Sequence, residues 1–351
     1  MVKIFFKLLN FNGLIIFVNN THKVEHALGN LLKTKDIAHI FVYRSIPIYY
    51  VNKNIIILNK FIFFIFSIIL GFRFQNKFIM IFSQPYFALP YIILGSSINV
   101  YFYDIHKGLL YTHKTKLMIE KISIYFFRNI IHRDLRLWVE YKKTIKKNFR
   151  KNLLIPDYAK KIKEIKFKKD NGKIKCAVIG WVDDQFVKVD DSIKILANLG
   201  VEIYFFTSKT SFELSIKNIL FDKSLMKQMH HIGYLNTEDL NNFLQDFSIG
   251  LSPHDAKKPK LSKNYRNYCS SMRLINYIEN SLTIFLSNKT FYQKFVCRKY
   301  NANCFDIKDL KFIKTIEQLK TLIIIKKIVY NNSIFNKKKL SKKLINFLAL
   351  N

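Results

Sequence analysis

The chain has 351 residues, half of them hydrophobic, so it is long enough for about two domains with proper cores, and disorder of the whole chain is excluded. Its 58 Lys and Arg residues exceed its 24 Asp and Glu residues, and the net charge of +34 favours contact with nucleic acid, anionic lipid or phosphorylated substrates. Only 10 Gly and 6 Pro accompany many Lys, Asn, Ile and Phe residues, as an AT-biased genome would produce, so part of the lysine content reflects residue usage.

Two apolar runs lie near the start of the chain. In MVKIFFKLLNFNGLIIFVNN, Lys7 and Asn10 interrupt the run and no small-residue cleavage site follows, which predicts a first strand region and no signal peptide. In residues 55–72, IIILNKFIFFIFSIILGF, the polar residues Asn59 and Lys60 interrupt the run and leave about twelve consecutive residues without a charge. A membrane-spanning helix needs about 20. We expect a helix that is buried or contacts a membrane. With the net charge, this favours the inner face of an anionic membrane; a lysine-rich soluble surface is the alternative.

Short apolar runs alternate with amphipathic stretches through the first half. The expected strands are LIIFVNN, AHIFVYRSI, KFIMIFSQP, INVYFYDIH and RNIIHRD, and the expected helices are VEHALGNLLKT, the Phe-rich segment, residues 115–127 and LRLWVEYKKTIKKNF. This alternation predicts βαβ units and a parallel sheet, with ligands at the carboxyl ends of the strands. Pro156 and the lysine run after it break the pattern, so we expect an N-terminal domain at 1–156 and a C-terminal domain at 157–351.

The second half repeats the pattern more cleanly. Strands are expected at KIKCAVIGWV, VEIYFFTSK, HHIGYL, SIGLSP, LTIFLS and NANCFD, with helices at DSIKILANLG, TEDLNNFLQDF and SSMRLINYIENS. The segment from Lys311 to the end predicts two or three helices with basic, solvated faces. The fold class is therefore α/β, in two halves.

Several enzyme signatures are matched only in part or are missing. HKVEH, at 22–26, has the HxxEH form of a zinc peptidase, but no acidic third ligand is evident downstream. HRDL, at 132–135, is similar to the kinase catalytic loop, but Val139 stands where that loop needs asparagine. Because GxGxxG and GxxxxGK[ST] are also absent, a bound nucleotide would have to meet helix N-termini without a glycine signature.

The cysteines form no CxxC pair, and each lies in or beside an apolar segment. They are Cys176, Cys269, Cys297 and Cys304. This favours reduced, buried thiols in a cytosolic environment over disulfides or a metal site.

A cation stands at an unusual position in SSMRLINYIENS. Ser270 or Ser271 is a natural N-cap, which puts Arg273 in the first turn, beside the positive end of the helix dipole. One interpretation is that an anion binds there, and the other is that Arg273 bends into solvent. Leu274, Tyr277 and Ile278 supply the apolar face of the helix.

From MHHIGYLNTEDLNNFLQDFSIGLSP to SSMRLINYIENSLTIFLS, the chain resembles the C-terminal domain of GT-B glycosyltransferases. The matching positions are Gly233, Glu238, Leu240, Ser252, Pro253, Leu274, Tyr277 and Ser287, with Arg273 where the family has lysine. The resemblance covers residues 174–306, and the first half matches only in the order of its elements. Asn276, Ser281 and Thr283 depart from the family's glutamate, glycine and proline, so the usual acidic contact to the nucleotide ribose is in question.

The resemblance implies two Rossmann-like domains facing a cleft, with a nucleotide-sugar held mainly by the second. Donor-binding residues would be Arg273, Ser270, Ser271, Lys188, Lys209, Ser208, Gly180, His254, Asp255 and Asn276. His254 and Asp255 could bond to sugar hydroxyls or form an ordinary polar loop. If a base is needed near the acceptor, we expect His106 to be the catalytic residue in preference to Asp104. The alternative is that His106 has a structural role.

The function expected from this resemblance is transfer of a sugar to a surface glycan or lipid-linked saccharide. The protein would be a bacterial cytoplasmic enzyme of polysaccharide biosynthesis, peripheral at the inner membrane face, with no metal and no cofactor beyond the donor. The alternatives are a catalytically silent scaffold of the same fold, favoured by Asn276, and a basic nucleic-acid-binding protein, favoured by the charge.

Overall fold

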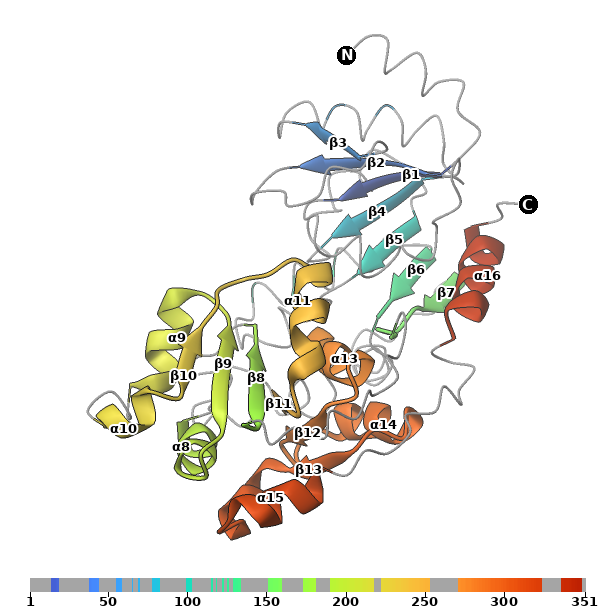
Figure 1. Cartoon of the computed structure of the whole chain (residues 1–351). Helices are drawn as coiled ribbons and strands as arrows, with labels where there is room; N and C mark the ends of the chain where they lie inside the picture. The colour runs from blue at the N-terminus through green and yellow to red at the C-terminus, as the bar shows by residue number, and fades with distance from the viewer. Residues whose placement is uncertain are drawn as a thin grey trace. The chain divides into compact units, whose positions relative to one another are not determined.

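The structure is a computed structural model, and it describes residues 14–18, 38–43, 55–58, 65, 69, 78–82, 99–102, 115, 118, 122, 125, 129–133, 151–159, 173–180, 190–217, 222–252, 271–323 and 336–348. The chain divides into two compact units. One comprises Met1–Asp157 with Ile334–Asn351, and the other comprises Tyr158–Ser333. Each unit has a parallel sheet of its own (Figure 1).

The sheet of the first unit has seven described strands, in the order β3-β2-β1-β4-β5-β6-β7. They are β1 (Leu14–Val18), β2 (Ala38–Tyr43), β3 (Ile55–Leu58), β4 (Phe78–Phe82), β5 (Asn99–Phe102), β6 (Asn129–His132) and β7 (Lys151–Leu154). Every pairing is parallel, and the strands predicted from the apolar runs are confirmed. Residues 55–58 form a strand where we expected the start of a helix, because Asn59 and Lys60 separate them from the Phe-rich run. β7 was not predicted.

Two helical segments of the first unit carry apolar side chains on the surface. Ile65 and Ile69 are helical and 37% and 43% exposed, and Met118, Ile122 and Tyr125 are helical and 57%, 42% and 64% exposed. The spacing within each set puts its members on one face of a helix. Of the helices that the structure describes, none is long and apolar enough to cross a membrane.

The C-terminal helix belongs to the first unit, which differs from the expected domain limits. α16 (Lys337–Leu348) packs against β7, and its Leu340 and Leu344 are buried. Its lysines at 338, 339, 342 and 343 are exposed, in keeping with the predicted basic face. The apolar positions recur every four residues, so the buried stripe is narrow and local composition does not reveal which sheet it covers.

The second unit has a sheet of six described strands, in the order β10-β9-β8-β11-β12-β13. These are β8 (Lys175–Ile179), β9 (Glu202–Phe206), β10 (Met229–His231), β11 (Ile249–Ser252), β12 (Thr283–Leu286) and β13 (Cys304–Asp306). All pair in parallel, as the sequence predicts. β11 and β12 are buried at every residue, which explains why they are continuous apolar runs without alternation.

The helices of the second unit cover the two faces of its sheet (Figure 1). They are α8 (Asp190–Asn198), α9 (Lys209–Ile216), α10 (Lys223–Met226), α11 (Thr237–Phe243), α13 (Met272–Glu279), α14 (Phe291–Lys299) and α15 (Ile316–Leu322), with the 3₁₀ helices η3 (Leu244–Asp246) and η4 (Ile307–Phe312). Right-handed crossovers put α11, α13 and α14 on one face and α8 and α9 on the other. The main apolar core joins α8, η4 and α15 to the strand residues that include Val178, Phe205 and Leu251.

The first unit contains a buried ion pair near residue 157, where the chain passes into the second unit. The Arg133 guanidinium donates from Nε to Asp157 Oδ2 at 2.8 Å, and its Nη2 lies 2.6 Å from the same oxygen. The side chains of Arg133 and Asp157 are only 9% and 8% exposed. Arg133 belongs to the HRDL segment, so that motif has a structural role at the end of β6.

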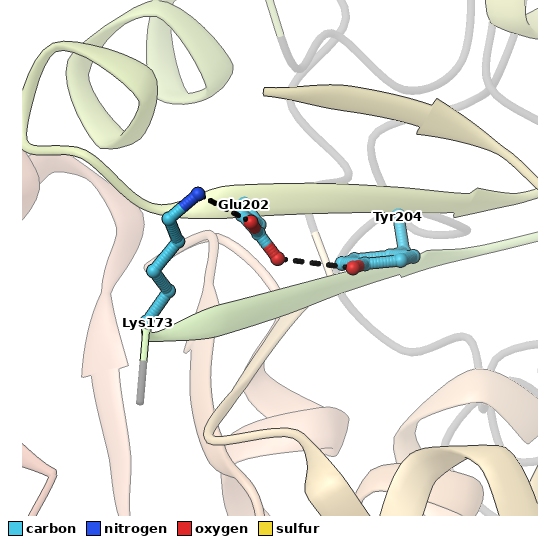
Figure 2. Close-up of polar contacts among 3 residues, drawn as sticks. All are labelled: Lys173, Glu202 and Tyr204. Carbon is cyan, nitrogen blue, oxygen red and sulfur yellow. Dashed lines mark hydrogen bonds and ion pairs between the residues drawn. The ribbon is translucent and has the colours of Figure 1, made fainter. Parts of the chain in front are cut away.

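A second polar group lies at the amino ends of β8 and β9 (Figure 2). Lys173 Nζ donates to Glu202 Oε1 at 3.0 Å, and the Tyr204 hydroxyl donates to Glu202 Oε2 at 3.0 Å. The bond from Lys173 is the main reason that the pKa of the Glu202 carboxyl lies below its usual value. Burial, followed by the bond to Glu202, raises the pKa of Tyr204 to about 12. Because Lys173 is 74% exposed, water screens this pair.

The two ion pairs predict losses of stability of different size when one charge is removed. Asp157→Asn leaves the buried Arg133 charge uncompensated, so we expect it to lower the free energy of unfolding by about 3–5 kcal/mol. Lys173→Met removes an exposed partner and should cost at most about 1 kcal/mol. Urea unfolding at pH 7 measures both, and equal losses in the two variants would contradict the assignment of Arg133 and Asp157 as a buried pair.

Candidate functional site

The strand order of the second sheet reverses direction between β8 and β11. From β8 the chain moves outward to β9 and β10, then returns to β11 and continues to β12 and β13. In open parallel sheets, ligands bind at the carboxyl ends of the strands beside such a reversal. The residues at this edge of β8 and β11 therefore define the candidate site.

Tyr277 of α13 fixes the helix to this edge. Its ring lies directly on Gly250 of β11, since a Cβ built on Gly250 would fall 2.5 Å from the ring Cγ. Its buried hydroxyl accepts the Ile179 N–H at 3.2 Å and lies 3.1 Å and 2.9 Å from the carbonyl oxygens of Ala177 and Leu251. One phenol thus joins both strands at the reversal, and its burial raises the pKa of Tyr277 well above the usual range.

Arg273 lies against the turn that follows β8. Gly180 has φ +80°, and its N–H donates to the Phe206 carbonyl at 3.0 Å, which ties the ends of β8 and β9 together. A Cβ on Gly180 would be 3.5 Å from Arg273 Nη2. The guanidinium therefore sits at the candidate edge, and the alternative in which it bends away into solvent is wrong.

The N-terminus of α13 lies at the same edge. The helix begins after Ser271, which is buried and has extended backbone angles, so Ser271 takes the N-cap position that the sequence predicted for Ser270 or Ser271. The Ser271 hydroxyl makes no capping bond to the helix, and the first turn contains no acidic residue. The backbone N–H groups of that turn and the Arg273 guanidinium give this end of the helix a positive field.

The end of β9 contributes Ser208 and Lys209. Ser208 is the N-cap of α9, and its hydroxyl accepts the Ser211 N–H at 3.2 Å. Lys209 is exposed at the first position of the same helix. Ser208 therefore has a capping role, and both residues stand at the edge that the sequence indicated.

Asn276 is buried on α13, one turn after Arg273. No nearby acid takes the place of the family's glutamate in α13. Glu279, which is also buried, lies six residues beyond Arg273, and its carboxylate faces Asn241 of α11 at 3.5 Å. At 1.5 Å rise per residue, Glu279 stands about 9 Å farther along the helix, away from the candidate edge.

A buried polar contact at this edge was not foreseen from the sequence. The Ser252 hydroxyl at the end of β11 donates to Gln293 Oε1 of α14 at 3.0 Å, and both residues are fully buried. Ser252 was singled out for its match to the family pattern, but Gln293 carried no local signal. The pair attaches α14 to the sheet beside α13.

The remaining site residues lie outside the described part of the chain. These are Asp104, His106, Lys188, His254, Asp255 and Ser270. β5 ends at Phe102, so Asp104 and His106 follow a confirmed strand at its carboxyl end. Within the described residues, no cluster of three or more His, Cys, Asp or Glu side chains could hold a metal ion.

Comparison with solved structures identifies the architecture. HepE of Anabaena, solved in complex with UDP, is 9% identical, with a TM-score of 0.64 over 96% of this chain and 100% of that chain. The lipopolysaccharide outer core galactosyltransferase WaaB is 10% identical, with a TM-score of 0.56 over 96% and 99%. The chain has the GT-B fold. Neither family models nor curated protein sequences gave a match.

The GT-B fold leaves the reaction open. A UDP-GlcNAc 2-epimerase from Neisseria meningitidis, solved with UDP-GlcNAc, is 9% identical, with a TM-score of 0.50 over 96% of this chain and 100% of that one. An epimerase and a galactosyltransferase are thus both among the structural neighbours. The assignment of an activity therefore depends on the side chains at the edge.

Removal of the Tyr277 hydroxyl tests whether it holds this edge together. Tyr277→Phe leaves the Ile179 N–H and two carbonyl groups without their buried partner, so we expect a loss of about 1–3 kcal/mol in the free energy of unfolding. Tyr234→Phe is the control, because Tyr234 is 59% exposed. Urea unfolding of both variants gives the comparison, and an unchanged midpoint for Tyr277→Phe would contradict the bridging role.

Proposed function

We propose that the chain is a glycosyltransferase that moves a sugar from a nucleoside diphosphate donor to an acceptor. The observation that carries the proposal is the Arg273 guanidinium against Gly180, at the strand reversal and beside the start of α13. A guanidinium presents two parallel donors that match phosphate oxygens, and helix N-terminal amides attract the same anion. A diphosphate at this position would meet both the cation of the first turn and the positive end of the helix dipole.

The positive groups at this edge suit the departure of a nucleoside diphosphate without a metal ion. As the bond to the sugar breaks, negative charge grows on the diphosphate oxygens. Arg273, the amides of α13 and a lysine at 188 or 209 would stabilise that charge. The diphosphate would lie along Ser271 and Gly180, with Ser270 and Ser208 nearby, and His254 and Asp255 would bind the sugar. UDP is the first donor nucleotide to test, because HepE was solved with UDP and with UDP and glucose.

The acceptor would approach the carboxyl end of β5. Asp104 and His106 follow that strand, and a histidine titrates in the range that a base needs near neutral pH. We assign His106 as the base of an inverting transfer, which takes the proton of the attacking hydroxyl. Asp104 would orient the imidazole.

The surface of the first unit supports a proposal for the acceptor class. Ile65 and Ile69, together with Met118, Ile122 and Tyr125, form exposed apolar faces in a chain of net charge +34. Such faces favour peripheral contact with anionic lipid at the cytoplasmic side of a membrane. A lipid-linked saccharide or a growing surface glycan is the acceptor that this location would supply.

Thermal melting with nucleotides tests the donor site. UDP should raise Tm by several degrees, because a ligand at about 100 times its Kd stabilises the native state by about 2.7 kcal/mol. GDP, CDP and TDP should have smaller effects. Arg273→Ala should abolish the shift. Arg273→Lys should keep part of it, because lysine retains the charge but lacks the two parallel donors of the guanidinium.

Arg298→Ala is the matched control, since Arg298 is exposed on α14. It should melt and bind UDP like the parent chain. The shift should persist in EDTA, and a shift that requires Mg²⁺ or Mn²⁺ would contradict metal-independent binding. If no nucleotide raises the Tm of the folded protein, the transferase proposal fails and the catalytically silent scaffold becomes the better interpretation.

Substitution of His106 separates catalysis from donor binding. His106→Ala should lower kcat about 10²–10⁴-fold for transfer to the acceptor while the UDP-induced rise in Tm stays unchanged. His106→Gln, which keeps a hydrogen-bonding side chain without a titrating group, should be equally impaired. For the parent chain, kcat should fall on the acidic side of its pH profile as the base becomes protonated. If that acidic limb persists in both variants, His106 is not the base.

A further inference from the structure

One face of α14 exposes aromatic rings and cations together. Phe291, Lys294, Phe295, Arg298 and Lys299 recur at the spacing of a single helical stripe, and we call this stripe the α14 face. Phe291 is 57% exposed and Phe295 is 37% exposed, and Arg298 is exposed beside them. The opposite stripe, which includes Tyr292, Val296 and Cys297, is buried against the sheet. The α14 face is therefore the outer surface of a helix whose inner surface is already occupied.

The charges around these rings have one sign. Residues 287–303 contain Lys289, Lys294, Arg298 and Lys299 and no Asp or Glu. A solvated helix face usually mixes both signs, and the isolated exposed Phe residues of a globular protein are not grouped in this way. Two exposed rings one turn apart among cations alone indicate a partner that is both apolar and anionic.

Phe295 and Lys299 contact each other on the α14 face before any partner arrives. Lys299 Nζ lies 5.4 Å from the centroid of the Phe295 ring, and the buried Tyr292 ring stacks on Phe295 with centroids 6.2 Å apart. The Ser252–Gln293 bond attaches the helix to the end of β11. The α14 face thus belongs to a helix that already packs on the sheet, and binding would not require the helix to fold first.

We propose that the α14 face docks the second unit onto an anionic phospholipid bilayer. Phe291 and Phe295 would enter the boundary between headgroups and acyl chains, and Lys294, Arg298 and Lys299 would contact lipid phosphates. Nucleic acid fits less well, because phenylalanine rings on a convex helix offer no groove that follows a phosphate backbone. This inference extends the membrane contact proposed for the first unit to a different surface.

The position of α14 gives this docking a consequence for the candidate site. Phe291 begins α14 just after the carboxyl end of β12, and Gln293 contacts the carboxyl end of β11. Arg273 lies at the same edge of the same sheet. Docking through the α14 face would therefore hold the donor edge at the bilayer surface. This part rests on the proposed function, whereas lipid binding itself does not.

Vesicle binding tests the docking surface in the full chain. Vesicles of phosphatidylcholine with phosphatidylglycerol should bind the protein, and the double variant Phe291→Ser, Phe295→Ser should bind at least about tenfold more weakly. Arg298→Glu should weaken binding to these vesicles and leave binding to pure phosphatidylcholine unchanged. Phe312→Ser is the matched control, because Phe312 is 78% exposed at the end of η4, on the other face of the sheet.

A spectroscopic reporter separates direct insertion from binding through the first unit. With Phe291→Trp, brominated acyl chains should quench more fluorescence than in the parent chain, whereas Phe312→Trp should show no added quenching. Equal vesicle binding by the parent and the double variant, without quenching at 291, would overturn the proposal. The proposal would also be overturned if Phe312→Ser weakened vesicle binding as much as the double variant does. A double variant that lost binding to RNA and kept binding to vesicles would overturn it as well. Loss of UDP binding in Arg273→Ala without any change in vesicle binding would concern the donor site alone.

Discussion

The contacts of the Tyr277 phenol fix the geometry of the candidate edge in the second unit. No loop connects β8 directly to β11, but the two strands pair through their backbones, with Leu251 opposite Val178, and a side chain that spans both reinforces their carboxyl ends. The Tyr277 hydroxyl contacts the backbone of β8 and β11, and its ring occupies the space that Gly250 leaves open. Arg273 lies four residues earlier, on the same face of α13, and helical side chains lean toward the N-terminus. The packing of the Tyr277 ring on Gly250 therefore directs the Arg273 guanidinium toward Gly180.

Local patterns predicted most strands but few of their long-range contacts. β8, β11 and β12 are buried on both sides, so their continuous apolar runs were unmistakable. β7 was missed because KNLL is short and half exposed, and α14 was missed because its outward stripe contains phenylalanine where a solvated face is expected. The sequence raised two interpretations of Arg273. Only the proximity of residue 180 to residue 273 decided between them, and no local pattern encodes that distance.

The electrostatics of α13 are unusual for a helix in this setting. A neutral Asn276 stands where the family has an acid, and Glu279 is turned toward Asn241 at the far end. The half of the helix that meets the strand ends is therefore positive through both its backbone dipole and its only basic side chain. A ligand recognised there would be selected by its negative charge, and ribose hydroxyls would depend on other groups for recognition. In the proposed donor site, asparagine at 276 would thus change how the ribose is selected and would leave the positive groups for the diphosphate in place.

The return of α16 to the first unit gives the chain the topology of an insertion. Residues 158–333 form a complete unit within a first unit whose last eighteen residues come at the end of the chain. During synthesis, the inserted unit can finish folding while the earlier unit still lacks the helix that buries Leu340 and Leu344 against β7. The order of completion is then the reverse of the order in which the two units begin to emerge from the ribosome. A nascent chain of this protein would consequently hold β7 uncovered until residues 337–348 have left the ribosome.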